Sequence, residues 1–288
     1  MASLILEYGI DGRFGCMSSD DEHHEEANDD EDDEKDDEDP GRPIVIPTES
    51  VKVLVVGDTI DWKGKTDPWG QDMSDEYTEL FTAPLIAELD KRNIEHGTCA
   101  LTVRGLREAL WSNTYSAVFV ADVLLPDERN DKAAFFNDKV RALIVAWVGQ
   151  GGKLVLRNGA KEVFADWFGK PWTYEGDFYR RTDHVYQHAS NVVPFAAKKD
   201  LPVGYNVKAS MLSHVADDEK LYAPVGGAVV HSAIPFPGFA GTKIDEGLCA
   251  IAVGRYQAGA LIYIGDVNAE VATNRCVRWP AWKCVNAP

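Results

Sequence analysis

The sequence predicts a doubly wound α/β fold, in which helices cover both faces of a mostly parallel sheet, with an added β-rich section and a C-terminal hairpin. Three observations predict this fold. Aliphatic runs recur along residues 51–158, and amphipathic helical segments separate them. From residue 172 onward the pattern changes to short alternating segments that Pro and Gly interrupt. Finally, residues 249–267 are two apolar runs joined by a tight turn at Gln257-Ala258-Gly259.

The predicted parallel strands are near-continuous aliphatic runs. VKVLVVGD at 51–58, SAVFVAD at 116–122 and KLVLRN at 153–158 lack the alternation of a strand with one wet face. Both faces of their sheet should therefore be covered, which favours a parallel sheet. IEHGTCAL, at 94–101, is a further candidate strand.

Amphipathic segments between these runs predict the helices. Residues 82–93 and 102–112 each begin at a threonine in a capping position, Thr82 and Thr102. The clearest helix lies within 131–152, where apolar residues recur at three- and four-residue intervals and a Gly pair follows. A last helix is expected after the hairpin, ending before Pro280.

The charge of the chain is concentrated in one segment. The formal net charge is −18, yet residues 20–39 alone hold fifteen acidic residues and one lysine, which leaves 32 acidic and 28 basic residues elsewhere. This segment has too few apolar residues to fold. We expect residues 1–48 to be a disordered acidic arm, either solubilising or able to dock a basic protein partner, and residues 49–288 to form a single α/β domain.

Composition also excludes several classes of protein. Five cysteines at irregular spacings give neither a zinc motif nor a secreted disulfide framework. No signal peptide and no apolar run of about 18 residues is present, so we expect no membrane contact and a cytoplasmic or nuclear location. No basic stripe exists to neutralise phosphates, so we expect no nucleic-acid binding.

Carboxylates end three of the predicted strands. Asp58, Asp122 and Asp266 each follow an aliphatic run, and ligands of open parallel sheets bind beyond the carboxyl ends of the strands. Paired carboxylates there could act as general acid and base or hold Mg²⁺ or Ca²⁺. The alternative is that each one only caps its own turn or the next helix.

Further polar residues could line the same crevice. The candidates for ligand binding are Asp61, Trp62, Asn158, Arg180 and Asn268, and His184 joins the catalytic candidates. His184 belongs to the polar stretch RRTDHVYQH, which could bind an anion. On a strand, His184 and His188 would lie roughly 13 Å apart. We therefore expect no metal site, and the absence of nucleotide-binding glycine motifs predicts no cofactor.

The order of elements resembles the class I glutamine amidotransferase-like superfamily, a flavodoxin-like α/β group that also includes trehalose-utilisation-type proteins. Three stretches carry the resemblance: VKVLVVGD with LDKRNIEHGTCAL, YSAVFVADVLLPDE with VRALIVAWVGQGGKLVL, and GALIYIGDVNAEVATNR. The last is similar to the closing strand of uncharacterised eukaryotic members. The resemblance covers roughly residues 50–275, with a poor match over 170–245.

The resemblance implies a member without glutaminase activity, a pseudoenzyme. Glutaminases of this superfamily carry a cysteine on the turn after the strand equivalent to KLVLRNG, and a His-x-Glu pair further on. Here Arg157-Asn158 occupies that turn, and no His-x-Glu follows in the C-terminal half. Without a thiol or hydroxyl, this turn cannot form a covalent acyl intermediate.

Two functions are therefore expected from the sequence. The first is a small-ligand-binding or interaction protein whose strand-end crevice holds a small polar ligand. The alternative is a hydrolase or lyase that uses Asp58, Asp122 and Asp266 on a small anionic substrate, with or without a divalent cation. The two differ in whether the carboxylates share one water or metal, or are occupied by local contacts.

Overall fold

The computed structural model describes residues 46, 52–57, 82–100, 102–122, 137–157, 163–187, 201–231, 241–267 and 273. By internal contacts the chain divides into two units, Met1–Arg42 and Pro43–Pro288, and every described residue belongs to the second unit. The predicted acidic arm lies outside the described residues. The single α/β domain over 49–288 stays a prediction.

Four helices and nine strands are described. The helices are α2 (Ala83–Lys91), α3 (Val103–Trp111), α4 (Asp138–Gly149) and α5 (Val163–Phe168). The strands are β1 (Lys52–Gly57), β2 (Glu95–Ala100), β3 (Ala117–Asp122), β4 (Lys153–Arg157), β5 (Thr173–Tyr186), β6 (Gly204–Ser213), β7 (Lys220–Pro224), β8 (Ile251–Tyr256) and β9 (Gly259–Ile264).

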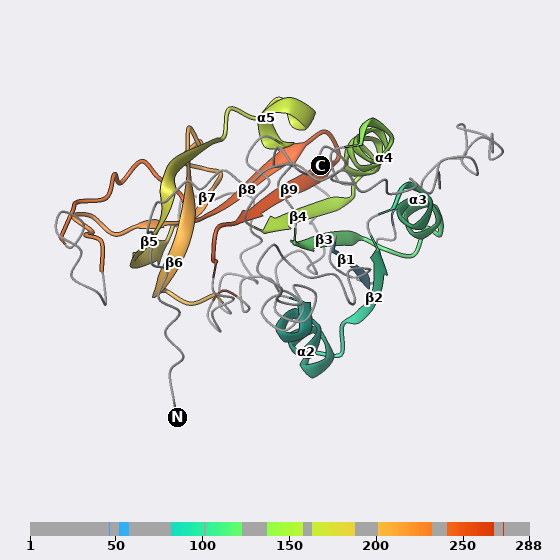
Figure 1. Cartoon of the computed structure of the whole chain (residues 1–288), viewed down its shortest axis with the longest axis horizontal. Helices are drawn as coiled ribbons and strands as arrows, with labels where there is room; N and C mark the ends of the chain where they lie inside the picture. Colours follow the sequence, from blue (N-terminus) through green and yellow to red (C-terminus); the bar gives the residue numbers. More distant parts are fainter. Residues whose placement is uncertain are drawn as a thin grey trace, which may run out of the picture. The chain divides into compact units, whose positions relative to one another are not determined.

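All nine strands belong to one mixed sheet, in the order β2-β1-β3-β4-β9-β8-β7-β5-β6 (Figure 1). From β2 to β9 the neighbouring strands run parallel. From β9 to β6 they run antiparallel. Strand β9 therefore belongs to both halves, and it connects them.

The prediction of a doubly wound, mostly parallel, flavodoxin-like sheet was wrong. Four strand pairings are parallel and four are antiparallel, so the sheet is mixed. The antiparallel strands are half of the sheet and not an embellishment at its edge. The sequence did not reveal the direction of the neighbouring strands, because β9 is buried along its whole length. A strand of that composition looks the same whether its neighbour runs parallel or antiparallel.

Helices cover both faces of the parallel half. Figure 1 shows α2 on one side of this half and α3, α4 and α5 on the other. Leu85 and Leu89 of α2 pack against β1, β3, β4 and β9 in one core. The three other helices pack against the opposite face, where Trp147 of α4 is completely buried. Coverage of both faces is what the continuous aliphatic runs predicted.

The antiparallel half rolls back onto the end of β9. Ala209 of β6 forms an isolated bridge with Asp266, just beyond β9. Ser210 N donates to Gly265 O at 2.8 Å, and Val267 N donates to Lys208 O at 3.1 Å. Strand β6 therefore has a backbone partner on its outer side, which satisfies groups that an edge strand would leave open.

One of the two predicted threonine caps is confirmed. Thr102 Oγ1 accepts a hydrogen bond from Gly105 N at 3.0 Å, which confirms the predicted cap of α3. Thr82 makes no side-chain cap, because its backbone is already helical. Of the helix predicted after the hairpin, only Thr273 is described.

Replacing Gly265 by alanine should destabilise the chain. A Cβ atom at this position would lie 1.9 Å from Ser210 O, a backbone atom of the β6 closure. We expect a loss of at least about 1–3 kcal/mol, the usual range for overpacking. Urea unfolding measures it as a lower midpoint with an unchanged slope.

Gly226→Ala is the matched control. A Cβ there would meet only Glu246 Oε1, at 3.7 Å, so we expect a change within about 0.5 kcal/mol. Equal midpoints for the two variants would contradict the close approach of β6 to Gly265.

Candidate functional site

The carboxyl ends of β1, β3, β4 and β9 lie along one edge of the sheet. Gly57, the last residue of β1, pairs with Asp122, the last residue of β3, so these strands are neighbours as the crevice hypothesis required. Ligands of open α/β sheets bind beyond such an edge, at the point where the chain reverses its direction of strand addition. Strand β1 is that point here, since β2 and β3 flank it.

Only two of the predicted site side chains are described, those of Asp266 and His184. Outside the described residues lie Asp58, Asp61, Trp62, Asn158 and Asn268. For Asp122 and Arg180 the strand backbone is described but not the side chain. Asp266 follows β9, which lies three positions from β1 in the sheet, or roughly 14 Å at normal strand spacing.

Asp266 forms a buried ion pair with Arg157. The carboxylate Oδ2 lies 3.7 Å from Arg157 Nη2, and each side chain is only 1% exposed. In addition, Arg157 Nε donates to the backbone oxygen of Asp266 at 3.3 Å. The two residues are brought together because β4 and β9 are adjacent and parallel, with Arg157 paired to Ile264.

Burial lowers the pKa of Arg157 from its usual value to about 10. Loss of water around the guanidinium is the largest cause, and the negative charge of Asp266 and the phenol of Tyr205 partly oppose it. The ion pair is also longer than a charge-assisted hydrogen bond, which is typically about 2.7–2.9 Å. The cost of burying this cation is therefore only partly offset by Asp266.

Tyr205 acts on the charge of Arg157, and Thr273 contacts Tyr205 in turn. Thr273 Oγ1 lies 3.5 Å from the Tyr205 hydroxyl, and Thr273 is fully buried. Tyr205 comes from β6, which reaches this place because it folds back onto the end of β9. Nothing in the local sequence identified either residue, since the approach of Tyr205 to Arg157 and of Thr273 to Tyr205 depends on long-range contacts.

His184 is buried and neutral on β5. Its Nδ1 lies 3.1 Å from Thr182 O and therefore donates to it, which leaves Nε2 as an acceptor. Nε2 has no hydrogen-bond partner among the described residues. Burial lowers the pKa of His184 from 6.5 to about 4, although the contact with Thr182 and the charge of Asp183 raise it.

The predicted polar cluster around His184 is divided between two faces of β5. Thr182 and His184 are buried on one face, as alternation along a strand requires. On the other face, Asp183 accepts from Asn206 Nδ2 at 2.9 Å and lies 3.4 Å from His231 Nε2. The two sets cannot form one anion site, because the sheet separates them.

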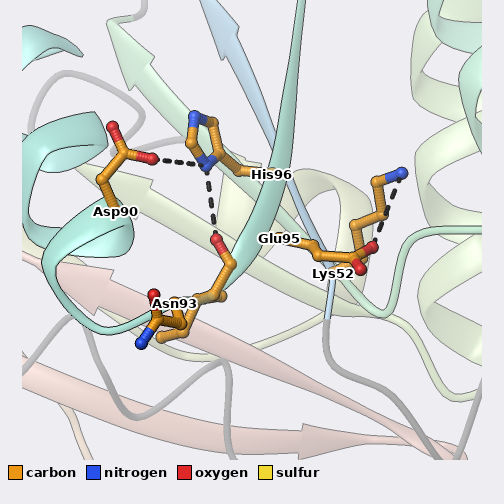
Figure 2. Close-up of a pocket in the computed structure, with 6 residues that line it drawn as sticks. Lys52, Asp90, Asn93, Glu95 and His96 are labelled. Atoms are coloured by element: carbon orange, nitrogen blue, oxygen red, sulfur yellow. Dashed lines mark hydrogen bonds and ion pairs between the residues drawn. The ribbon is translucent and has the colours of Figure 1, made fainter.

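The hollow in Figure 2 lies at the amino-terminal ends of β1 and β2, opposite the carboxyl-terminal edge that carries Arg157. It has a volume of about 500 Å³ and is lined by residues of α2 and of the amino-terminal ends of β1 and β2. His96 Nδ1 points toward Asp90 Oδ1 at 3.7 Å, and Lys52 points toward Glu95 at 3.9 Å. Its charges are paired with one another and lie away from the carboxyl edge, so we do not regard it as the site.

The described residues contain no activated nucleophile near Arg157. The thiol of Cys249 is fully buried, and burial raises its pKa to about 12. No group of three or more His, Cys, Asp and Glu side chains within the described ranges could hold a metal ion.

No helix in the described part of the chain is long and apolar enough to cross a membrane. This finding concerns helices only.

No protein-family model and no curated protein matches the chain. Several solved structures do. A β-galactosidase from Bacillus circulans sp. alkalophilus is 14% identical with a TM-score of 0.42, and the match covers 83% of this chain but 32% of that one. A β-galactosidase from Halorubrum lacusprofundi is 11% identical with a TM-score of 0.43, and the match covers 84% of this chain and 31% of that one. A cytoplasmic protein from Salmonella typhimurium LT2 is 13% identical with a TM-score of 0.40, and the match covers 82% of this chain and 98% of that one.

The chain spans less than a third of the length of these galactosidases. At this identity and TM-score the matches assign no activity and no substrate to it. The predicted membership of the class I glutamine amidotransferase-like superfamily was wrong. No family model matches the chain, and its sheet is mixed instead of the mostly parallel, flavodoxin-like sheet that the resemblance implies.

Breaking the buried ion pair should destabilise the fold strongly. Asp266→Asn leaves the guanidinium of Arg157 buried without its counter-charge, and we expect a loss of about 3–5 kcal/mol. Combining it with Arg157→Met should recover most of that loss, because no uncompensated charge remains. Urea unfolding of the single and double variants measures the coupling. Additive losses would show that the pair does not interact.

Acid should destabilise the chain through His184. Above pH 6.5 the ring is neutral in both folded and unfolded chains, so it adds no pH dependence. As the pH falls from 6.5 to about 4, the unfolded chain binds a proton that the folded chain does not. Stability is therefore lost over this window, by about 3 kcal/mol in total.

Unfolding curves between pH 7.5 and 4 measure this loss. The His184→Gln variant should show a smaller decrease than the wild type. His214→Gln, at an exposed position, is the control and should keep the wild-type decrease. A wild-type slope in His184→Gln would show that other groups cause the acid sensitivity.

Proposed function

We propose that this chain binds a small anionic ligand at the carboxyl-terminal edge of its parallel strands, with Arg157 as the anion-binding group. Asp266 orients the guanidinium, and Tyr205 supplies a hydroxyl group near it. The observation that carries the proposal is the position of Arg157, a buried cation at the carboxyl end of β4, on the same edge as the switch point at β1 and two strand positions from it.

The state of Arg157 supports this assignment. Its pKa stays lowered to about 10 even with Asp266 beside it, and the carboxylate lies 3.7 Å away. The planar guanidinium can bind a carboxylate or a phosphate through two parallel hydrogen bonds, so these two classes of anion are the first to test.

The alternative, a hydrolase or lyase based on Asp58, Asp122 and Asp266, receives no specific support from the described residues. Asp266 is engaged by Arg157 and lies three strand positions from β1. It is placed to orient a cation rather than to share a proton with another carboxylate.

Two further properties remain proposals that rest on the sequence alone. The acidic segment at 20–39 has the charge to engage a basic protein partner. The irregular cysteine pattern fits a cytoplasmic or nuclear location.

Ligand binding is tested by thermal unfolding of the whole chain with a panel of sodium carboxylates and inorganic phosphate at pH 7.5. A ligand present at 100 times its Kd adds about 2.7 kcal/mol to the stability of the folded state. We expect at least one anion to raise Tm in proportion to the logarithm of its concentration. No shift across the panel at concentrations up to 50 mM, on the order of weak-ligand Kd values, would contradict the proposal.

Variants at Arg157 identify the binding group. Arg157→Lys keeps the charge but loses the planar fork, and we expect the ligand-induced shift to fall to a small fraction of the wild-type shift. Arg181→Lys is the matched control, since Arg181 lies on the opposite, outward face of β5 beside Asn206. An unchanged shift in Arg157→Lys would remove Arg157 from the site.

A further inference from the structure

Three segments form an arm at one end of the sheet (Figure 1): residues 180–186 of β5, residues 204–209 of β6, and residues 225–231. Strands β5 and β6 are paired in antiparallel register. Residues 225–231 run along the other side of β5, and both ends of this segment donate to backbone oxygens of β5, at 3.1 and 2.8 Å. The backbone hydrogen bonds therefore make the arm one connected unit.

The arm has a small core of its own. Its apolar side chains are Val207, Ala209 and Val230, and they pack with Ile244 and Leu248. This core is separate from the two larger cores that cover the faces of the sheet. A unit with its own small core often opens cooperatively while the remainder of a protein stays folded. The arm has the structure of such a unit.

His184 lies at the boundary between the core of the arm and the core on the α2 side of the sheet. It is the cross-strand partner of Tyr205, and Tyr205 packs against both of these cores. Toward β7, His184 pairs with Pro224, which has no N–H group to donate to the strand ladder. A charge on His184 would therefore act where the arm joins the rest of the sheet.

The hydrogen bonds of His184 suit only its neutral form. Nδ1 donates to Thr182 O at 3.1 Å, so Nε2 is the unprotonated nitrogen of the ring. Nε2 is buried and has no hydrogen-bond partner in the described part of the chain. A proton on Nε2 would therefore create a buried donor that nothing described here accepts, and such a group is costly.

The titratable groups that face His184 in the described part of the chain are phenols. They are Tyr186 of β5, Tyr205 of β6 and Tyr222 of β7. Phenols carry no charge at or below neutral pH. The charge of Asp183 favours a protonated ring, but Asp183 lies on the opposite face of β5 beside His231, and burial outweighs its effect. Protonation would place a poorly compensated cation between the two cores.

We propose that the arm is an acid-sensitive device, in which protonation of His184 releases residues 180–186, 204–209 and 225–231 from the sheet while the parallel half stays folded. Release gives the ring access to water, where it binds its proton with ordinary affinity. It also removes Tyr205 from Arg157, on whose charge Tyr205 acts in the closed form. The inference does not depend on anion binding at Arg157.

Amide hydrogen exchange of the whole chain at pH 7.5 and pH 5 tests the proposal, after correction for the intrinsic pH dependence of exchange. At both pH values the amides of the arm should share one protection factor, lower than that of β1, β3 and β4. Between the two pH values this shared factor should fall on the order of 30-fold, because the open arm binds a proton that the closed arm does not. Equal protection of the arm and the parallel strands would overturn the proposal.

Two further measurements assign the effect to His184. His184→Gln should remove most of the fall in protection, whereas His231→Gln, at an exposed position of the same arm, should retain it. A fall of wild-type size in His184→Gln would exclude His184 as the cause. Because this variant can fail to fold, the pH profile of the wild-type arm gives an independent result. Protection should begin to fall near pH 6.5, the usual pKa of an exposed histidine, and a fall that begins only below pH 5, where carboxylates titrate, would contradict the proposal.

Discussion

The backbone hydrogen bonds between β6 and residues 265–267 bring Tyr205 of β6 toward Arg157 of β4. They fold the antiparallel half of the sheet back onto the end of β9, so that β5 and β6 extend past the carboxyl ends of the parallel strands. Gly265 permits this approach, because any side chain there would meet the backbone of Ser210. Without the closure, Tyr205 would lie on an open edge of the sheet, five strands away from Arg157.

The ion pair between Arg157 and Asp266 has to be interpreted together with this closure of β6. A buried ion pair is weak evidence for stability by itself, since an apolar pair of similar size often serves as well. Here the pair lies at the carboxyl ends of β4 and β9, on the edge that also carries the switch point at β1, and Asp266 only partly offsets the effect of burial on the pKa of Arg157. We therefore interpret the pair as an orienting arrangement for a cation that meets a ligand.

The local structure was largely predictable from the sequence, but the sheet and the site were not. The aliphatic runs at β1, β3 and β4, the helix at α4 and the hairpin of β8 and β9 were all confirmed, because each depends on short-range patterns. The direction and order of pairing depend on contacts between distant segments, and β9 is equally apolar toward its parallel and its antiparallel neighbour. For this reason the mostly parallel sheet and the amidotransferase-like family were both wrong.

The contacts of individual site residues also depend on segments that are distant in the sequence. Alternation along β5 separates His184 from Arg181 and Asp183, although the three are almost consecutive in the sequence. Asp266 was correctly noticed at a strand end, but its partner turned out to be Arg157 and not another carboxylate. Tyr205 carried no local signal, because its role follows from the closure of β6.

A crystal structure of the chain grown in a carboxylate salt tests the central claim most directly. The account predicts density for the anion beyond the ends of β4 and β9, with a carboxylate oxygen about 2.7–2.9 Å from the guanidinium of Arg157. A structure in which protein atoms alone enclose Arg157, with no anion at that edge, would contradict it.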